Sequence, residues 1–600
     1  MIQIGGERGR RLKPQLRDWG ISTLVAVPFL WLYVAHFLFA SGHGTGFLQY
    51  DMPYYVSVGR SIFTRGNGVL SPNPFDLNGP AIYFQWFPWL LGIGTVFLHA
   101  DAGYFYCALG VVFAIGLARV TLALVRACGG RSHELLLLIL AFWGGGLLGI
   151  GGVLNGLLTL GWDCFRVTKA SGQAIMALDS GNGFWFLNWG RNSIFTTEAL
   201  YHILVGVIWL GVLRNRWLWV AVGMVLITST HPWTGLEVLG MLLAYLGWVY
   251  VARRERPPVW FQLSLALCGC AFFWYYGLYL NQFESHRQIV ATWKFSDLVL
   301  PDLSFVLSIA LVLVVVIYRF QKVISFTRSD EFLGICFLIS TILCTHQHWM
   351  TPVQPIHFHR GYPWMALFLL GLPAINKWLE TRSFAKRSIA QAIGGAAIIL
   401  LFCSDNLVFI ATRTLVLRNM AHSLTLSDPE RRLVNWMDST SSRGLFLASN
   451  LNFSYLTSAY SNVTPYLGHR YLTPNFEQHE DTMRRFYSGS SSVLPYHLKY
   501  LLITPSDSSF VHSSLAGLCV RYDQDGYRLF QLRANDTSHI EVHSSLGQVK
   551  RTLNEASKIF CAMPDSLPLV IMWDCRIRDA LMYDQYFKHA VYRSLSRRNG

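Results

Sequence analysis

The chain has 600 residues, of which 52% are hydrophobic and only 14% are charged, and it carries a formal net charge of +15. A soluble globular protein carries about 25% charged residues, so this composition excludes a disordered chain, a coiled coil and a collagen-like chain, and it argues against an ordinary soluble enzyme. The class that remains is a helical protein that crosses the membrane many times and carries some soluble mass.

The first apolar run follows a basic N-terminus. Five basic residues precede it, namely Arg8, Arg10, Arg11, Lys13 and Arg17. The run itself extends from Trp19 to about Ala40, which is long enough to span a bilayer. Because it lacks a clear small-residue cleavage site, we expect a retained first helix with a cytoplasmic N-terminus.

Further apolar runs follow this first helix along the chain. They lie near 103–125, 134–157, 199–213, 217–230, 235–252, 259–280, 303–319, 331–345, 362–376 and 388–411. With the first run, this predicts about eleven spans. We assign the apolar segment 81–99 to the outer interface or to a re-entrant helix, because counting it as a span would invert every later loop.

This assignment places every basic loop in the cytoplasm, so most of the excess positive charge is expected to mark the cytoplasmic side of the membrane. The basic isoelectric point is therefore not taken as a sign of nucleic-acid binding. The main outer loops are then 41–102, 158–198, 281–302 and 345–361. An odd number of spans leaves the tail outside the cell, which divides the chain into a membrane domain, 1–411, and an extracytoplasmic domain, 412–600.

The tail alternates short apolar runs with turn residues, which is typical of buried strands. Such runs begin at Gly444, Tyr500 and Tyr527, and segment 428–440 is typical of a helix. We therefore predict a small α/β domain. Cys519, Cys561 and Cys575 lie in this tail, and whether two of them form a disulfide stays open. No role is assigned to residues 540–600.

The first outer loop contains Tyr50-Asp51-Met52-Pro53-Tyr54-Tyr55. A carboxylate at a membrane boundary among aromatic side chains is partly desolvated, which raises its pKa and suits a general base. We therefore single out Asp51, with Tyr54 and Tyr55 as substrate-binding candidates. A solvated loop residue or the cap of the following helix is the alternative for Asp51.

Histidines and a few cations gather in the predicted outer loops. One short loop holds His346, His348, His357, His359 and Arg360. This group suits an anionic ligand, and zinc is the weaker reading because no carboxylate or cysteine lies close in that loop. Other outer cations are Arg191, Arg287 and Lys294, which suit either a phosphate or lipid headgroups.

Two further acidic residues lie at predicted span ends. Glu198 and His202 are one helical turn apart and share a face. The segment from His231 to Glu237 predicts a tight outer turn, with Glu237 just inside the membrane and facing a cavity rather than lipid. With Arg191, these four residues complete the substrate-binding candidates.

The pattern resembles the GT-C superfamily of membrane glycosyltransferases over nearly the whole chain. The first-loop motif around Asp51, with Arg60 and Ile62 following, looks like that family's acidic first-loop motif. Segment 80–98 looks like its membrane-edge helix, and His359-Arg360-Gly-Tyr362-Pro363 is similar to the start of a late span. The tail is similar to the soluble domain of bacterial members, in three segments that begin at Tyr466, Tyr500 and Val520.

The resemblance implies an inverting transferase that takes a sugar from a polyprenyl-phosphate carrier and gives it to a glycan, lipid or protein of the cell envelope. It makes Asp51 the base and assigns the donor phosphate to Arg360, with His359, Lys294 and Arg287 behind it. The first loop has no DxD pair and the tail no WWD-type motif, so no divalent metal or other cofactor is expected. The bacterial likeness favours the plasma membrane.

Two other functions fit the same pattern. A transporter or flippase for a lipid-linked or anionic solute also places ionisable residues in the membrane, although it usually shows paired repeats and broken helices at mid-depth. A non-catalytic scaffold protein of the same shape is the third interpretation. Sugar, acceptor, carrier length and oligomeric state stay open.

Overall fold

The computed structural model describes residues 5–532 apart from 41, 132, 167, 184, 295–298, 323–326, 382–388, 420–423, 491–493, 496 and 508–517. Cys561, Cys575 and the whole of 540–600 lie outside these residues, and so does any disulfide of Cys519 with either partner. Cys519 itself is exposed.

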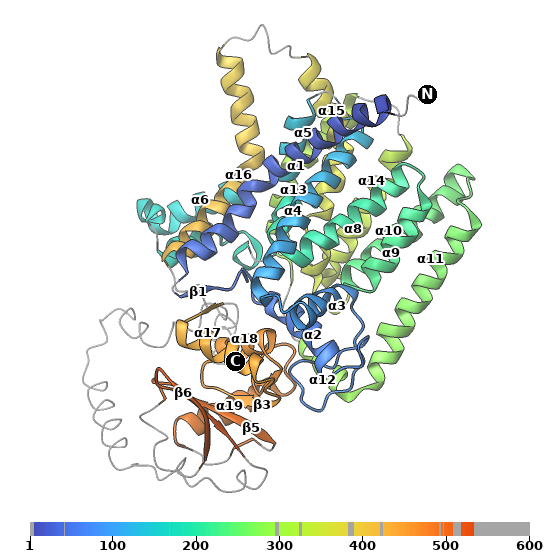
Figure 1. The fold of residues 1–600 in the computed structure, drawn as a ribbon. Coiled ribbons are helices and arrows are strands. Elements are labelled where there is room, and N and C mark those ends of the chain that lie inside the picture. Colours follow the sequence, from blue (N-terminus) through green and yellow to red (C-terminus); the bar gives the residue numbers. More distant parts are fainter. Residues whose placement is uncertain are drawn as a thin grey trace, which may run out of the picture. The chain divides into compact units, whose positions relative to one another are not determined.

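The chain forms two compact units (Figure 1). The helical unit comprises 1–39, 84–94 and 98–420, and the mixed unit comprises 40–83, 95–97 and 421–600. The mixed unit thus joins part of the first outer loop to the tail, whereas the sequence division at residue 411 had left that loop with the membrane domain.

The helical unit is a polytopic membrane bundle. Its long helices are α1 (Gly5–Phe39), α4 (Ala102–Ala127), α5 (Glu134–Trp143), α6 (Leu148–Leu160), α8 (Thr196–Leu213), α9 (Trp217–Thr228), α10 (Pro232–Trp248), α11 (Val259–Phe272), α13 (Asp302–Lys322), α14 (Arg328–Cys344), α15 (Tyr362–Thr381) and α16 (Ile389–Asn419). Eight segments of the described chain are long and apolar enough to cross a membrane, and three shorter apolar helices accompany them. The predicted class, a multi-spanning helical membrane protein with an α/β domain, is confirmed.

Short helices connect these elements. They are α3 (Trp86–Gly92), which continues as a π-helix over Ile93–Phe97, α7 (Lys169–Ile175) and α12 (Glu284–Lys294). Helix α10 continues as a π-helix over Val249–Arg253 and α11 over Phe273–Tyr279, which lengthens both spans.

Helices α1 and α4 are antiparallel neighbours. Near the start of α1, Asp18 accepts hydrogen bonds of 2.6 Å from Arg126 at the end of α4. At the other end, the rings of Phe37 and Tyr104 stack at 5.4 Å. The chain between the two helices therefore leaves and re-enters at one end of the unit, as expected if the segment around α3 does not cross.

The tail leaves the helical unit at this same end. Trp31, in the last third of α1, donates a 3.1 Å hydrogen bond to Thr414 near the end of α16. Because α1 and α16 end side by side, the first loop and the tail depart from the same end of the helical unit.

The predicted single span 134–157 is wrong, because the helix breaks between α5 and α6. The break coincides with three consecutive glycines, Gly144 to Gly146. Asp405 of α16 accepts hydrogen bonds of 2.7 Å from the backbone N–H groups of Gly146 and Gly149, which replaces the missing helical bonds. A Cβ at Gly146 would lie 1.8 Å from the Leu307 carbonyl oxygen, so only glycine fits.

The mixed unit has a five-stranded sheet in the order β4-β3-β5-β7-β6. Its strands are β3 (Gly444–Leu447), β4 (Val463–Pro465), β5 (Leu498–Ile503), β6 (Cys519–Gln524) and β7 (Tyr527–Gln531). Strand β3 is parallel to β4 and β5, and β7 is antiparallel to β5 and β6. A two-residue pairing of β1 (His43–Gly44) with β2 (Thr425–Leu426) ties the first loop to the tail.

Among its described residues, the mixed unit also contains the helices α2 (Met52–Thr64), α17 (Asp428–Ser439), α18 (Leu451–Tyr460) and α19 (Phe476–Tyr487). The predicted helix 428–440 and the three predicted strands are confirmed. Helix α17 begins with a capping box, in which Ser427 and Glu430 exchange hydrogen bonds.

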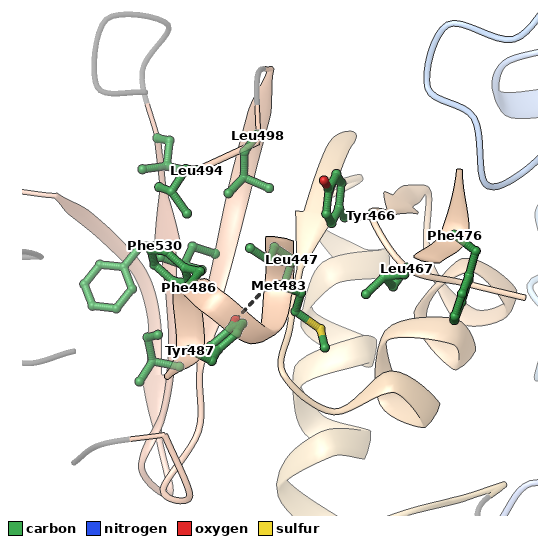
Figure 2. Close-up of a cluster of buried hydrophobic side chains, with 13 residues drawn as sticks. Leu447, Tyr466, Leu467, Phe476, Met483, Phe486, Tyr487, Leu494, Leu498 and Phe530 are labelled. Carbon is green, nitrogen blue, oxygen red and sulfur yellow. Dashed lines mark hydrogen bonds between the residues drawn. The ribbon is translucent and has the colours of Figure 1, made fainter. Parts of the chain in front are cut away.

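The core of the mixed unit lies between the sheet and α19 (Figure 2). Leu501 of β5 and Phe486 of α19 are 0% and 1% exposed. Tyr487 belongs to the same buried cluster, and its hydroxyl donates a 2.7 Å hydrogen bond to the Leu502 carbonyl. Burying the ring while satisfying its hydroxyl fixes how α19 lies on the sheet.

Helix α2 is anchored to the tail by buried polar groups. The Arg60 guanidinium, 7% exposed, forms an ion pair with Asp438 and donates a 3.0 Å hydrogen bond to Asn462. The hydroxyls of Ser57 and Ser458 are 2.8 Å apart. A buried arginine needs such partners, so these contacts hold α2 and the tail in one unit.

Leu501→Ala should destabilise the mixed unit by about 2–5 kcal/mol, because it leaves a cavity in the centre of the sheet. Thermal unfolding of the full-length chain in detergent, followed by protease sensitivity of the tail, measures this loss. Val520→Ala is the control, since Val520 is 47% exposed on the edge strand β6. Equal losses in both variants would contradict the packing described here.

Candidate active site

Asp51 occupies the N-cap position of α2, but its side chain does not cap the helix. Instead, Oδ1 accepts a 2.8 Å hydrogen bond from Nε2 of His469. The Asp51 side chain is 49% exposed, whereas the His469 side chain is 5% exposed. The carboxylate is therefore held on one side and open to solvent on the other.

The tautomer of His469 follows from its second nitrogen. The backbone N–H of Tyr471 donates to Nδ1 at 3.3 Å, so Nδ1 is an acceptor and the proton lies on Nε2. The ring packs 4.6 Å from Tyr50 and 5.7 Å from Tyr455. His469 is thus a neutral, fixed hydrogen-bond donor to Asp51.

The two predicted tyrosines differ in their relation to this pair. The ring of Tyr54 lies 6.0 Å from His469 and 6.2 Å from Phe75. The ring of Tyr55 packs against Tyr54 at 5.4 Å. Tyr54 therefore belongs to the aromatic surround of the pair, with Tyr55 one layer further out.

His469 was missed by the sequence reasoning, although its segment was among those that resemble the family. It lies 418 positions from Asp51, and no local pattern links the two. The only available signal was a histidine directly after Gly468 in a segment rich in aromatic residues.

A second cluster, in the helical unit, is built around Arg360. Its guanidinium forms an ion pair with Glu198 at the start of α8, and both side chains are under 10% exposed. It also donates a 2.7 Å hydrogen bond to Nδ1 of His357. Arg360 has a left-handed φ of +34°, which is costly for a residue other than glycine and persists only where surrounding contacts impose it.

His202 contacts both Arg360 and its partner Glu198. Its two ring nitrogens lie 2.7 Å from the carbonyl oxygens of Glu198 and Arg360. Asn192 donates a further 3.1 Å hydrogen bond to the Arg360 carbonyl. The predicted shared face of Glu198 and His202 is confirmed, and the pair holds the Arg360 loop against α8.

His231 and Glu237 lie on α10. His231 is the N-cap, where Nδ1 accepts a hydrogen bond from the Thr234 N–H, and its ring stacks on Tyr201 at 4.6 Å. Glu237 is fully buried and accepts a 2.5 Å hydrogen bond from Ser340. Within the described residues, its Oε2 has no hydrogen-bond partner. Glu237 therefore faces protein rather than lipid, and the predicted cavity beside it stays a prediction.

The four histidines of the predicted loop do not converge. His346 accepts a bond from the Val353 N–H, and His348 contacts Asp302. His359 contacts Ser308 through Nε2 and accepts from the Gly361 N–H at Nδ1. In the described part of the chain, no three His, Cys, Asp or Glu side chains are grouped as metal ligands.

Burial keeps two of these histidines neutral. It lowers the pKa of His357 well below its ordinary value, and the nearby Arg360 charge lowers it further. Burial also lowers the pKa of His359 to about 3. Arg360 is therefore the charged member of this loop segment, and the histidines act as neutral hydrogen-bonding groups.

The remaining cations occupy different settings. Arg191 is fully buried, with its guanidinium 2.5 Å from Asp179, 3.1 Å from the Asn406 side chain and 4.3 Å from the Phe409 ring centroid, which favours a structural role. Arg287 is half exposed and pairs with Glu284 of its own helix. Lys294 is the last residue of α12, and its side chain lies outside the described part of the chain.

The Arg360 cluster lies at the end of the bundle from which the first loop departs. Thr196, two residues before Glu198, donates a 3.0 Å hydrogen bond to the Tyr106 carbonyl near the start of α4. Its hydroxyl is also 3.4 Å from that of Tyr33, near the end of α1. The starts of α4 and α8 and the end of α1 therefore meet beside this cluster.

Comparisons with known proteins give distant likenesses only. No family model and no curated protein matches the sequence. Among solved structures, the chain is similar to the archaeal oligosaccharyltransferase AglB from Archaeoglobus fulgidus, in complex with an inhibitory peptide and a dolichol-phosphate, at 11% identity over 81% of this chain and 69% of that chain, with a TM-score of 0.40.

The chain is also similar to ArnT from Cupriavidus metallidurans in the apo state, at 11% identity over 88% of this chain and 100% of that chain, with a TM-score of 0.39. At such scores, the residues of this chain have to carry the functional assignment.

The buried, neutral His359 should make stability depend on pH. Its folded pKa lies below the unfolded value near 6.5, so the unfolded chain binds more protons as pH falls from about 6.5 toward 3, and stability falls with it. At pH 5 the loss is about 2 kcal/mol.

Thermal unfolding of the full-length chain in detergent between pH 7.5 and 5 measures this loss. His359→Gln should flatten the dependence, because a neutral amide takes up no proton. His348→Gln is the control, since the His348 side chain is 54% exposed. An unchanged slope in His359→Gln would count against a buried neutral His359.

Proposed function

We propose that the chain is a GT-C-type membrane glycosyltransferase that moves a sugar from a polyprenyl-phosphate carrier to a hydroxyl of a cell-envelope glycan, lipid or protein. Asp51 is the general base. The observation that carries this proposal is the half-exposed Asp51 carboxylate, which a buried neutral histidine holds in place. A base needs a fixed position and access to its proton donor, and Asp51 has both.

The reaction needs one proton removed and one anion released. Asp51 takes the proton from the acceptor hydroxyl while the oxygen of that hydroxyl attacks the anomeric carbon and forms the new glycosidic bond. The bond from that carbon to the phosphate oxygen breaks, and the polyprenyl phosphate leaves with the electron pair. Direct displacement inverts the anomeric centre, and a phosphate leaving group needs little acid assistance.

Arg360 is the best-supported donor-phosphate ligand among the predicted cations. It lies at the end of the helical unit from which the Asp51 loop departs, and it carries the charge of its loop. In the structure, the guanidinium of Arg360 is paired with the Glu198 carboxylate. A phosphate would replace one anion by another, and the arginine fork suits a bidentate contact with phosphate oxygens.

The remaining parts of the proposal follow from the chemistry and the resemblance. The partners are a lipid-linked sugar and a hydroxyl-bearing envelope acceptor, and no cofactor is required by the steps above. The reaction takes place at the outer face of a bacterial plasma membrane, with the N-terminus in the cytoplasm and the mixed unit outside. His359, Lys294 and Arg287 remain secondary candidates for the phosphate.

Asp51→Asn should lower sugar transfer by at least about 10²-fold, because the amide cannot accept the acceptor's proton. The assay uses the full-length chain in liposomes that contain synthetic polyprenyl-phosphate hexoses and pentoses, with envelope extract from a deletion strain as acceptor. Radiolabelled sugar leaving the donor lipid measures transfer.

Asp76→Asn is the matched control, because Asp76 is a partly exposed carboxylate of the same loop region whose Oδ1 accepts from the Asn78 N–H. Its activity should stay near wild type. Full activity in Asp51→Asn would overturn the proposal, and transbilayer movement of unaltered donor without sugar transfer would favour a flippase.

Arg360→Gln should raise the KM for the donor about tenfold or more while changing the acceptor KM little, since a charge-assisted hydrogen bond to phosphate is lost. Removing only the arginine leaves Glu198 buried and unpaired, so the variant is also made together with Glu198→Gln. Steady-state kinetics in the liposome assay separate the two KM values.

Arg253→Ala serves as the control, because Arg253 lies in a predicted cytoplasmic loop and is 40% exposed. Arg287→Ala tests the next candidate in the same assay. A donor KM that rises only in Arg287→Ala would move the phosphate site to that residue.

A further inference from the structure

We propose that His469, from the C-terminal part of the chain, is the positioning residue of the Asp51 base. It holds Oδ1 of the carboxylate so that Oδ2 is presented to the acceptor hydroxyl. This inference rests on the proposed function. It adds a residue that neither the family resemblance nor the sequence motifs assigned, and it gives the tail a direct part in the reaction.

The first support is the complementary exposure of the two side chains. Asp51 is 49% exposed and His469 is 5% exposed, with 2.8 Å between Oδ1 and Nε2. Within the described residues, no hydrogen bond to Oδ2 is found, so this oxygen is available for a proton. Since both nitrogens of His469 are engaged, the ring cannot take the proton itself, and the base is the carboxylate.

The second support is the rigidity of the donor. The Tyr455 hydroxyl donates a 2.6 Å hydrogen bond to the Tyr50 carbonyl, and the Arg470 N–H donates to the Tyr50 hydroxyl at 3.2 Å. These bonds join the residues next to Asp51 to the residues next to His469. The two segments therefore hold their relative position before substrate arrives, which lowers the entropy cost of reaching the reactive geometry.

The third support is the packing around the histidine ring. Phe75 limits the orientations that the His469 ring can adopt, because its own ring lies 6.4 Å away in a stacked orientation. A Cβ at Gly468 would lie 2.2 Å from Phe75, so the residue before His469 has to be glycine for this approach. The glycine and the aromatic rings together fix the direction of the Nε2–H bond.

The chemistry needs no further proton carrier. The acceptor O–H bond breaks and its proton moves to Oδ2, while the His469 proton stays on Nε2 and continues to donate to Oδ1. The Asp51 carboxylate loses its negative charge when it takes the proton, and the departing polyprenyl phosphate gains one negative charge. His469 keeps one tautomer throughout, because the Tyr471 N–H occupies Nδ1.

The test compares three variants of the full-length chain in the liposome assay. His469→Leu removes the donor and should lower kcat about 10- to 100-fold, with little change in donor KM. His469→Gln places an amide N–H within reach of Oδ1 and should recover most of the activity. His479→Leu is the control, because His479 stacks on Tyr466 at 4.2 Å and bonds to its carbonyl rather than to Asp51.

The pH profile separates positioning from folding. A hydrogen bond to a carboxylate favours its charged form, so the acidic limb of kcat against pH should move to higher pH in His469→Leu and stay near wild type in His469→Gln. A merely structural role would lower the amount of folded enzyme without moving this limb. Gel filtration and thermal unfolding of each variant report the folded amount.

Each outcome decides one claim. If Asp51→Asn keeps full activity, the proposed function fails, whatever His469 does. If Asp51→Asn is inactive but His469→Leu behaves like His479→Leu in kcat and pH profile, only the role of His469 fails. If His469→Leu does not fold, the Gln variant decides: near-normal kcat and pH limb support the role, and loss of kcat with an unmoved limb overturns it.

Discussion

Every backbone N–H and C=O group inside a bilayer needs a partner within the protein, and this constraint governs the helical unit. Where the chain is helical, the partners are local. Where three glycines interrupt it between α5 and α6, the Asp405 carboxylate of α16 accepts the freed N–H groups. The break is thus supported by a helix more than 250 residues later in the chain, and these hydrogen bonds tie α16 to the start of α6.

Charged side chains obey the same rule. Arg191, Arg319 and Arg360 are each under 10% exposed, and each forms an ion pair with a carboxylate. Burying such a pair contributes little net stability, but removing one partner leaves an uncompensated charge. These pairs therefore act mainly by allowing only one arrangement of the helices. Arg360 differs from the other two in its place in the fold. It lies in the connection that precedes α15, whereas Arg191 lies in the 3-10 helix Gly190–Ile194 and Arg319 in α13.

The sequence predicted what depends on local pattern. Apolar runs located the membrane helices, because hydropathy acts over a single span. The helix expected over 428–440 was found because its pattern is local, and the capping box of Ser427 and Glu430 begins it. Asp51 was singled out as a candidate for the same reason, as a carboxylate of the first outer loop flanked by aromatic residues. The break within 134–157 was missed, although the glycine run was visible, because its stabilising carboxylate comes from far away.

The contacts of the candidate site were beyond such reasoning. No periodicity relates Asp51 to His469, or Arg360 to Glu198, because these pairs form only when distant segments meet. In sequence, only the family resemblance ranked the cations of the outer loops, with Arg360 first. The structure distinguishes them by their partners, with Arg191 enclosed by protein groups, Arg287 bonded within its own helix and Arg360 paired across two elements.

The composition of the mixed unit has a consequence for biosynthesis. Its first segment ends at residue 83 and its last begins at residue 421, so one part of a single fold is made long before the other. At ribosomal speeds of about 5–20 residues per second, the interval is roughly 20–70 s. Throughout that time α2 carries an arginine and an apolar face whose partners do not yet exist. Nascent chains of this protein therefore pass through a stage in which the Asp51 loop lacks the segments that it packs against, and a chain truncated before the tail would remain in it.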